Sequence, residues 1–211
     1  MKPVMLKFAM LCMVLLATSA GRSMLAQTSL GVKGGYTAAT LRGEDAGNVD
    51  WHSGFAGGLF VNVAVLKFFT VQPELLFRQR GGQNNNETFN INQKLKLTYM
   101  DLPVLFKLRV PIAKTFYPHV YAGPQFSYNL NGEYEVTAGS ISADDPIEVR
   151  KVDFGGVMGF GLDVVVKRLF LTADFRYGLG AINIDDSDEP FLLKNKDLSI
   201  LLGIGVNFGG K

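Results

Sequence analysis

Five charged residues alternate along the chain with mostly apolar residues, and their types could form ion pairs. They are Glu74, Arg78, Asp163, Asp174 and Arg176, and Asp101 and Lys107 could join them. Opposite charges attract strongly where water is excluded, and each then offsets part of the cost of burying the other. Such a network permits two functions: a gated path for ions, or a polar plug that fills and stiffens an interior.

The two histidines are the residues best suited to acid–base catalysis. An enzyme that modifies lipid A would pair His52 or His119 with a serine or an acidic residue. Ser53 directly follows His52, but neighbouring residues on a strand point to opposite faces. Because no spacing of nucleophile, base and orienting residue is visible, we expect no catalytic residue.

Carboxylates are concentrated in two further segments. They are Glu133, Glu135, Asp144, Asp145 and Glu148 in the first, and Asp185, Asp186, Asp188 and Glu189 in the second. Dense carboxylates can bind calcium or bridge to lipid phosphates through divalent ions, and they can equally form a solvated acidic rim. The spacing lacks the central glycine and the final glutamate of an EF-hand loop. We expect neither a metal site nor a cofactor.

The segments that hold the first charges alternate between apolar and polar residues, which is typical of strands with different surroundings on their two faces. In residues 169–177, one face carries Leu169, Leu171, Ala173, Phe175 and Tyr177, and the other carries Phe170, Thr172, Asp174 and Arg176. Burying such charges in an oily core would cost several kcal/mol per ion. A polar lumen with an apolar outside is therefore favoured over a soluble barrel, whose faces would be reversed.

Eight such strands can be placed along the chain. They are residues 29–41, 53–66, 69–81, 93–109, 116–131, 152–166, 169–181 and 196–208. Short connections at 67–68, 110–115 and 167–168 alternate with long ones at 42–52, 82–92, 132–151 and 182–195. Bacterial barrels have even strand numbers, short periplasmic turns and longer external loops. The pattern predicts an all-β, eight-stranded antiparallel up-and-down transmembrane β-barrel with both termini in the periplasm.

The fourth strand changes phase. Leu95, Leu97 and Tyr99 share one phase, and Leu102, Val104, Phe106 and Leu108 share the opposite one. An extra residue would restore the alternation, and Pro103 lacks the donor that a regular ladder requires. We therefore expect a β-bulge at residues 100–103.

The N-terminus has the layout of a secretory signal peptide, with basic, apolar and small-residue parts. We expect cleavage after Ala26, or alternatively after Ala20, so that residues 1–26 are removed and 27–211 form the barrel domain. Removal of Lys2, Lys7 and Arg22 leaves 18 of 21 basic residues against 19 acidic ones, and the net charge falls from +2 to −1. Nucleic acid is therefore not an expected partner.

Four segments resemble one known family. They are Gly31–Tyr36, Tyr99–Leu105, Tyr121–Pro124 and Asp174–Gly180. They are similar, in order and spacing, to motifs of the PorT-like, porin-family outer membrane protein beta-barrel domain proteins of Gram-negative bacteria. The resemblance covers about residues 28–208 and implies an eight-stranded outer-membrane barrel with both ends in the periplasm. It implies little about activity.

The last strand resembles a barrel-assembly signal through Gly203, Val206 and Phe208. This resemblance implies recognition by the barrel-assembly machinery during biogenesis. An ordinary last strand that ends in phenylalanine accounts for the same residues.

These observations predict a small integral outer-membrane protein with a structural or surface-interaction role. Eight strands leave an interior that side chains just fill, and a general diffusion porin needs about 16 strands. A narrow ion or small-solute channel is the alternative, and a lipid-A-modifying enzyme is the third hypothesis. The expected partners are outer-membrane lipid and lipopolysaccharide, with an unknown protein partner at the external loops.

Overall fold

The computed structural model describes residues 28–42, 50–86, 91–138, 141–146, 150–181 and 194–208. Its strands are β1 (Thr28–Arg42), β2 (Asp50–Leu66), β3 (Phe69–Asn86), β4 (Ile91–Arg109), β5 (Phe116–Ala138), β6 (Ile141–Pro146), β7 (Val152–Val166), β8 (Leu169–Gly180) and β9 (Lys194–Asn207). No helix among these residues is long and apolar enough to cross a membrane. The predicted signal peptide and its cleavage sites lie outside the described residues.

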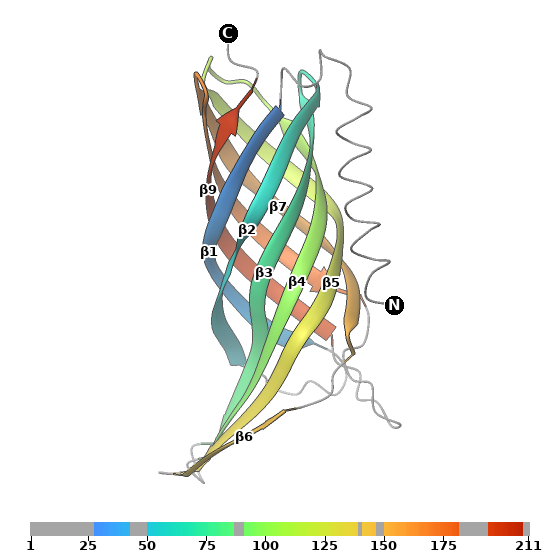
Figure 1. Ribbon diagram of the computed structural model, residues 1–211, viewed down its shortest axis with the longest axis vertical. Helices are drawn as coiled ribbons and strands as arrows, with labels where there is room; N and C mark the ends of the chain where they lie inside the picture. The colour runs from blue at the N-terminus through green and yellow to red at the C-terminus, as the bar shows by residue number, and fades with distance from the viewer. Residues whose placement is uncertain are drawn as a thin grey trace.

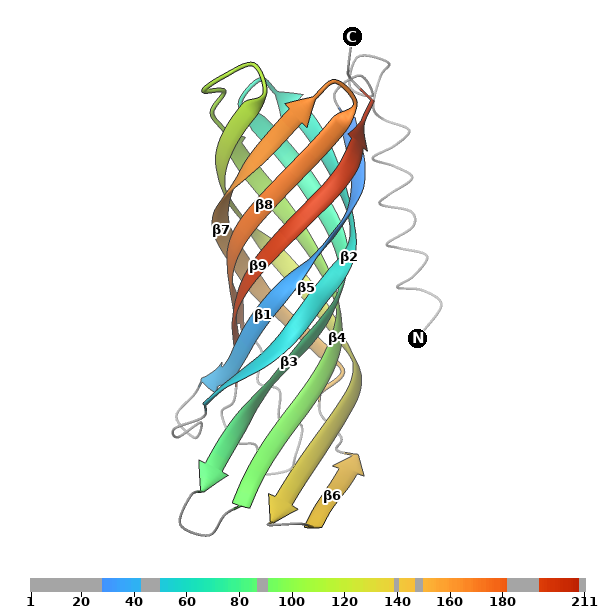
Figure 2. The same cartoon turned by 90° about the vertical axis from the view of Figure 1, so that its left-hand side faces the viewer.

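Eight of the strands close into a barrel, which confirms the predicted fold class (Figures 1 and 2). Every pairing in the ring is antiparallel, and β1 completes the ring by pairing with β9. The short strand β6 pairs only with β5 among the described residues, so the ring passes directly from β5 to β7. The eight predicted strands therefore correspond to β1–β5 and β7–β9.

The two ends of the barrel differ in the length of their connections. Residues 67–68, 110–115 and 167–168 connect strands at one end, which we call the turn end, where β1 begins and β9 finishes. At the other end, the loop end, β3, β4 and β5 reach beyond the remaining strands and β6 lies against β5 (Figure 2).

The predicted connections at 82–92 and 132–151 are partly wrong, because paired strands occupy much of both. The β3–β4 ladder continues to the pair Asn86–Ile91. In the second connection, β5 and β6 form a hairpin in which Glu135 pairs with Asp144. Four of the acidic residues assigned to this loop, Glu133, Glu135, Asp144 and Asp145, therefore belong to strands. The acidic residues 185–189 and Glu148 lie outside the described residues.

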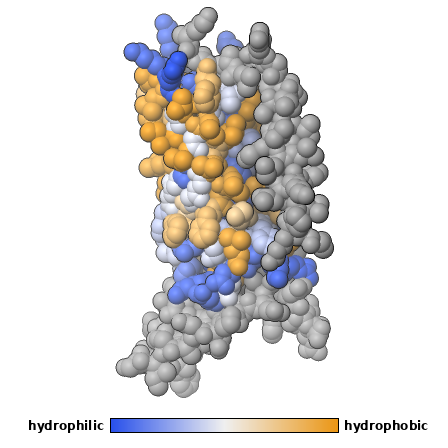
Figure 3. Space-filling model, in the orientation of Figure 1, coloured by the Kyte–Doolittle hydropathy of each residue, from blue (hydrophilic) through white to orange (hydrophobic). Residues whose placement is uncertain are grey.

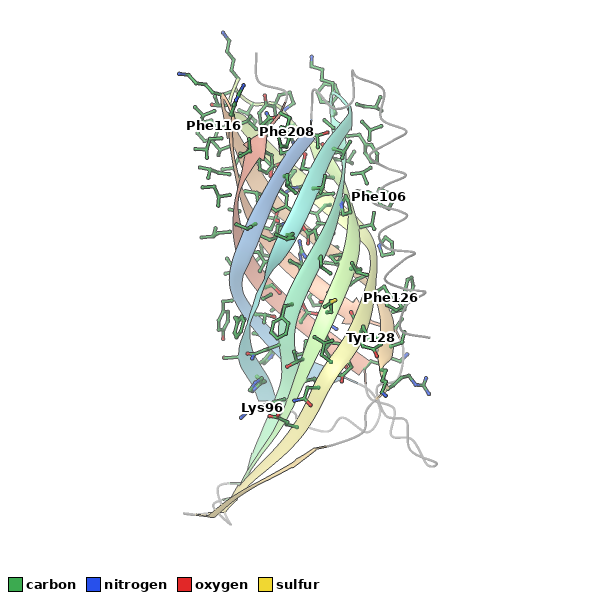
Figure 4. All side chains as sticks on the ribbon, in the orientation of Figure 1. Lys96, Phe106, Phe116, Phe126, Tyr128 and Phe208 are labelled. Atoms are coloured by element: carbon green, nitrogen blue, oxygen red, sulfur yellow. The ribbon has the colours of Figure 1, made fainter. Side chains whose placement is uncertain are left out.

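Exposed large apolar side chains come from all eight strands of the ring, and on the face shown in Figure 3 they form a mostly apolar band over the body of the barrel. Phe106 and Phe116 are about half exposed, at 45% and 47%, and lie on the outside of the ribbon (Figure 4). On β8 every second residue from Phe170 to Arg176 is buried and the residues between them are exposed. The charged face therefore lines the lumen, as the alternation of residues 169–177 predicts.

The bulge predicted within the fourth strand is wrong. The β3–β4 register runs without a shift from Phe69–Leu108 to Asn86–Ile91, and Leu97 and Tyr99 are buried in the lumen in phase with Asp101. The extra residue lies on the neighbouring strand instead, because Thr98 pairs with Asn131 while Tyr99 pairs with Asn129. Leu97 and Tyr99 face inward although they are largely apolar, and they alternate in step with the inward residues Asp101, Leu105 and Lys107. The inward and outward positions therefore alternate without interruption along the strand.

Gly159 makes room for a lumen side chain, which leads to a testable prediction. A Cβ atom there would lie 2.2 Å from the Phe175 carbonyl oxygen and 2.6 Å from the Tyr121 hydroxyl. Since backbone cannot move aside easily, we expect Gly159→Ala to lower the free energy of unfolding by about 1–3 kcal/mol. Gly156→Ala on the same strand is the control, because the nearest atom to its Cβ lies 4.0 Å away. Equal denaturation midpoints for the two variants would contradict this assignment of faces.

Candidate functional site

The lumen contains many buried charged side chains. Arg78, Lys107, Asp163 and Arg176 have no exposed surface, and Glu74 and Asp174 are each 2% exposed. Buried charges persist in proteins where they are paired and hydrogen-bonded. The ion pairs sort these residues into two clusters at different depths.

The turn-end cluster consists of Lys33, Glu74, Lys107, Arg109, His119, Asp163, Asp174 and Arg176. Its centre is Glu74, which accepts hydrogen bonds from Lys33 Nζ at 2.7 Å and from Arg176 Nη1 at 2.8 Å. Lys33 also donates to Asp174 at 2.6 Å. One lysine therefore joins carboxylates from two strands on opposite sides of the ring, β3 and β8.

The second part of the turn-end cluster surrounds Asp163 and His119. Asp163 lies 3.3 Å from Lys107 Nζ and 3.2 Å from Arg109 Nε. The His119 ring lies between two carboxylates, with Nε2 2.9 Å from Asp174 and Nδ1 3.5 Å from Asp163. His119 thus connects the two parts and has no serine in these contacts.

The loop-end cluster consists of Arg78, Arg80, Asp101, Asp153 and Asp197. Arg78 pairs with Asp197 and, through Nε at 3.1 Å, with Asp101. Arg80 donates to Asp101 at 2.9 Å and lies over the Tyr99 ring. Two arginines here face three carboxylates, whereas the turn-end cluster has four lysines and arginines for three carboxylates. The lumen is therefore more acidic toward the loops.

Two groups of apolar side chains, which we together call the apolar layer, lie along the strands between charged residues of the two clusters. Leu76 lies between Glu74 and Arg78 on β3, and Leu105 lies between Asp101 and Lys107 on β4. Leu76 packs with Ala56 and Leu201, and Leu105 packs with Tyr121 and Val157. Leu76, Leu105 and Leu201 have no exposed surface. Among the described residues, no ion pair joins one cluster to the other across this layer.

The structure brings the five predicted lumen residues inside the barrel but divides them. Glu74, Asp163, Asp174 and Arg176 belong to the turn-end cluster, and Arg78 belongs to the loop-end cluster. Asp101 and Lys107 also face inward, one in each cluster. Six members of the two clusters were not predicted as part of an ion-pair network: Lys33, Arg80, Arg109, His119, Asp153 and Asp197. Their alternation with apolar neighbours was the available signal, for example Val32 before Lys33 and Leu198 after Asp197.

The three candidate assembly-signal residues lie at the turn end of β9 and beyond it. Val206 and Phe208 are exposed on the outer face, at 48% and 61%. Gly203 faces the lumen, where a Cβ atom would meet Thr172 at 2.7 Å. The Phe208 amide donates to the Thr28 carbonyl at 2.8 Å, which extends the closing ladder by one bond.

Two of the residues considered for catalysis lie on different faces of the barrel, because His119 is buried in the lumen and Ser53 is exposed. The Ser53 hydroxyl lies on the outer face, 2.5 Å from the Tyr36 hydroxyl. Within the described ranges, no group of three or more His, Cys, Asp or Glu residues is arranged to hold a metal ion.

Residues 25–183 match the family model described as outer membrane protein beta-barrel domain. No curated protein matches the chain. Among solved structures, the chain is similar to Ail of Yersinia pestis, with 14% identity, a TM-score of 0.41, and coverage of 85% of this chain and 98% of that chain. It is also similar to Neisserial surface protein A, with 14% identity, a TM-score of 0.47 and coverage of 85% and 97%. The N-terminal barrel domain of Pseudomonas aeruginosa OprF has 14% identity, a TM-score of 0.35 and coverage of 86% and 98%.

Proposed function

The chain belongs to the outer membrane protein beta-barrel domain family of the Gram-negative outer membrane, and we propose that it is a structural or surface-interaction barrel whose lumen is closed by side chains. In this role, the barrel anchors the loop end and its extended β3–β6 sheet at the membrane surface. A protein partner would then bind at the loop end. The closed lumen is what separates this function from the alternative of a narrow channel.

The apolar layer between the two clusters is the observation that carries the proposal. An ion moving through the lumen would have to leave one set of charges and pass Leu76, Leu105 and Leu201 before it reached the next. Those side chains are fully buried and offer no polar atom to replace the water around an ion. Paired charges on both sides stiffen the interior rather than line an open path.

A planar-bilayer recording tests the closed lumen. We expect the refolded mature protein to show no reproducible conductance steps, because the apolar layer interrupts the polar interior. Heat-modifiable electrophoretic mobility would establish that the same preparation is folded. Reproducible steps that change in size with Arg176→Ala or Asp174→Ala would overturn the proposal in favour of a narrow charged channel.

The turn end, with both termini of the barrel, would face the periplasm, since barrels of this class have short turns on that side. Signal-peptide removal and recognition of Gly203, Val206 and Phe208 by the barrel-assembly machinery would precede insertion.

Membership of the PorT-like branch is the finer relationship that the four sequence motifs support. A non-enzymatic role is supported by His119, because its ring is buried in the lumen and its described polar contacts are two carboxylates and no serine or threonine hydroxyl.

A further inference from the structure

Four exposed cations occupy the turns at the turn end. Lys67 lies between β2 and β3, Lys114 lies between β4 and β5, and Lys167 and Arg168 lie between β7 and β8. We call these four residues the turn-end rim. In the part of the chain that the structure describes, no carboxylate forms an ion pair with any of them.

The rim is a local feature and not the result of a basic chain. After removal of the predicted signal peptide the net charge is −1, and the described carboxylates Glu133, Asp144 and Asp145 belong to β5 and β6 at the loop end. The described carboxylate nearest to the rim in the sequence is Asp163, whose side chain is fully buried in the lumen. Among the described residues, the turns at this end therefore carry four cations and no carboxylate.

The rim also marks the edge of the apolar surface. Lys67 lies between Leu66 and Phe68, which are 66% and 52% exposed, and Lys114 follows Ile112, which is 75% exposed. Figure 3 shows hydrophilic residues at the upper edge of the apolar band, at the turn end. Lysine and arginine at such an edge lay their carbon chains on apolar surface and place the charge in the polar layer beyond it. In a bilayer, that layer contains the lipid phosphates.

We propose that the turn-end rim binds the phosphates of anionic phospholipid head groups in the leaflet around the turn end. Each lysine or arginine near an anionic surface favours association by roughly fivefold. Three separate turns contribute, so the contact extends around the barrel and would fix its depth and tilt. This inference requires only that the barrel lies in a bilayer. It is independent of the closed lumen and of which side faces the periplasm.

Lipid selectivity tests the proposal directly. The mature barrel is refolded in phosphatidylcholine vesicles that contain spin-labelled phosphatidylglycerol or spin-labelled phosphatidylcholine, and the relative association constant of the two labels is measured. We expect a several-fold preference for phosphatidylglycerol at low salt. The preference should fall toward 1 at high salt and in the joint variant Lys67→Gln, Lys114→Gln, Lys167→Gln and Arg168→Gln.

A matched control removes the same number of charges at the loop end. The joint variant Lys96→Gln, Arg150→Gln, Lys151→Gln and Lys194→Gln should keep most of the preference (Lys96 is labelled in Figure 4). Equal loss in both joint variants would overturn the proposal, because net charge and not the rim would then set selectivity. Absence of a preference in the wild-type barrel would also overturn it, as expected if the rim binds an acidic protein instead. Conducting steps in the bilayer recording would refute the closed lumen and leave this result unchanged.

Discussion

Glu74→Ala is expected to lower the free energy of unfolding of the barrel by about 3–5 kcal/mol, the cost of breaking a buried ion pair by removing one partner. Glu74 accepts hydrogen bonds from Lys33, Arg176 and Gln72 at 2.6–3.1 Å. The substitution leaves Lys33 and Arg176 buried with only Asp174 nearby to balance them. Denaturant-induced unfolding of the refolded protein in lipid vesicles measures the change.

Two further variants give this result its meaning. Glu133→Ala removes an exposed carboxylate and should change the stability little, since surface substitutions usually stay within about 0.5 kcal/mol. Glu74→Gln keeps the shape and should fall between the two. If Glu74→Ala cost less than about 1 kcal/mol, water would be reaching Lys33 and Arg176 readily, and the lumen would have to be regarded as hydrated rather than closed.

Strand positions and faces could be predicted where most of the inward residues are polar. In β8, Thr172, Asp174 and Arg176 all face the lumen, so the alternation alone assigns both faces. The same rule fails where the lumen is apolar. Leu97 and Tyr99 face inward beside Asp101. If all apolar residues are assumed to face lipid, these two residues wrongly predict that the inward and outward faces of β4 exchange. The separating layer of Leu76, Leu105 and Leu201 could not be predicted for the same reason.

The partners of the charges could not be predicted because they depend on how the ring closes. Lys33 and Asp174 are 141 residues apart in the sequence, and Arg78 and Asp197 are 119 apart. Their contact follows from strand tilt and from the stagger between strands, which sum over the whole ring. The β5–β6 hairpin was missed on local grounds, because Ile-Ser-Ala-Asp-Asp-Pro in β6 lacks the alternation that marks the other strands.

The second large loss of stability is expected from Leu202→Arg, a substitution on the outer, lipid-facing surface of the barrel. Leu202 is 63% exposed at the centre of the apolar face of β9, with Leu198 and Ile200 on its loop side and Ile204 and Val206 on its turn side. An arginine at the bilayer midplane of a barrel costs about 2–4 kcal/mol. We expect this loss of stability in equilibrium folding experiments in lipid vesicles.

Depth dependence distinguishes a membrane effect from a general loss of packing. Val206→Arg introduces the same side chain on the same face near the turn end, where the expected cost falls to about 0–1 kcal/mol. In detergent micelles, which have no fixed midplane, the two variants should differ less than in vesicles. Equal costs in vesicles would contradict the placement of the hydrocarbon centre at Leu202. Glu74 lines the lumen, whereas Leu202 lies on the outer surface of the barrel. A soluble barrel with an apolar core and a polar outside would tolerate Leu202→Arg and could not hold Glu74 as an ion.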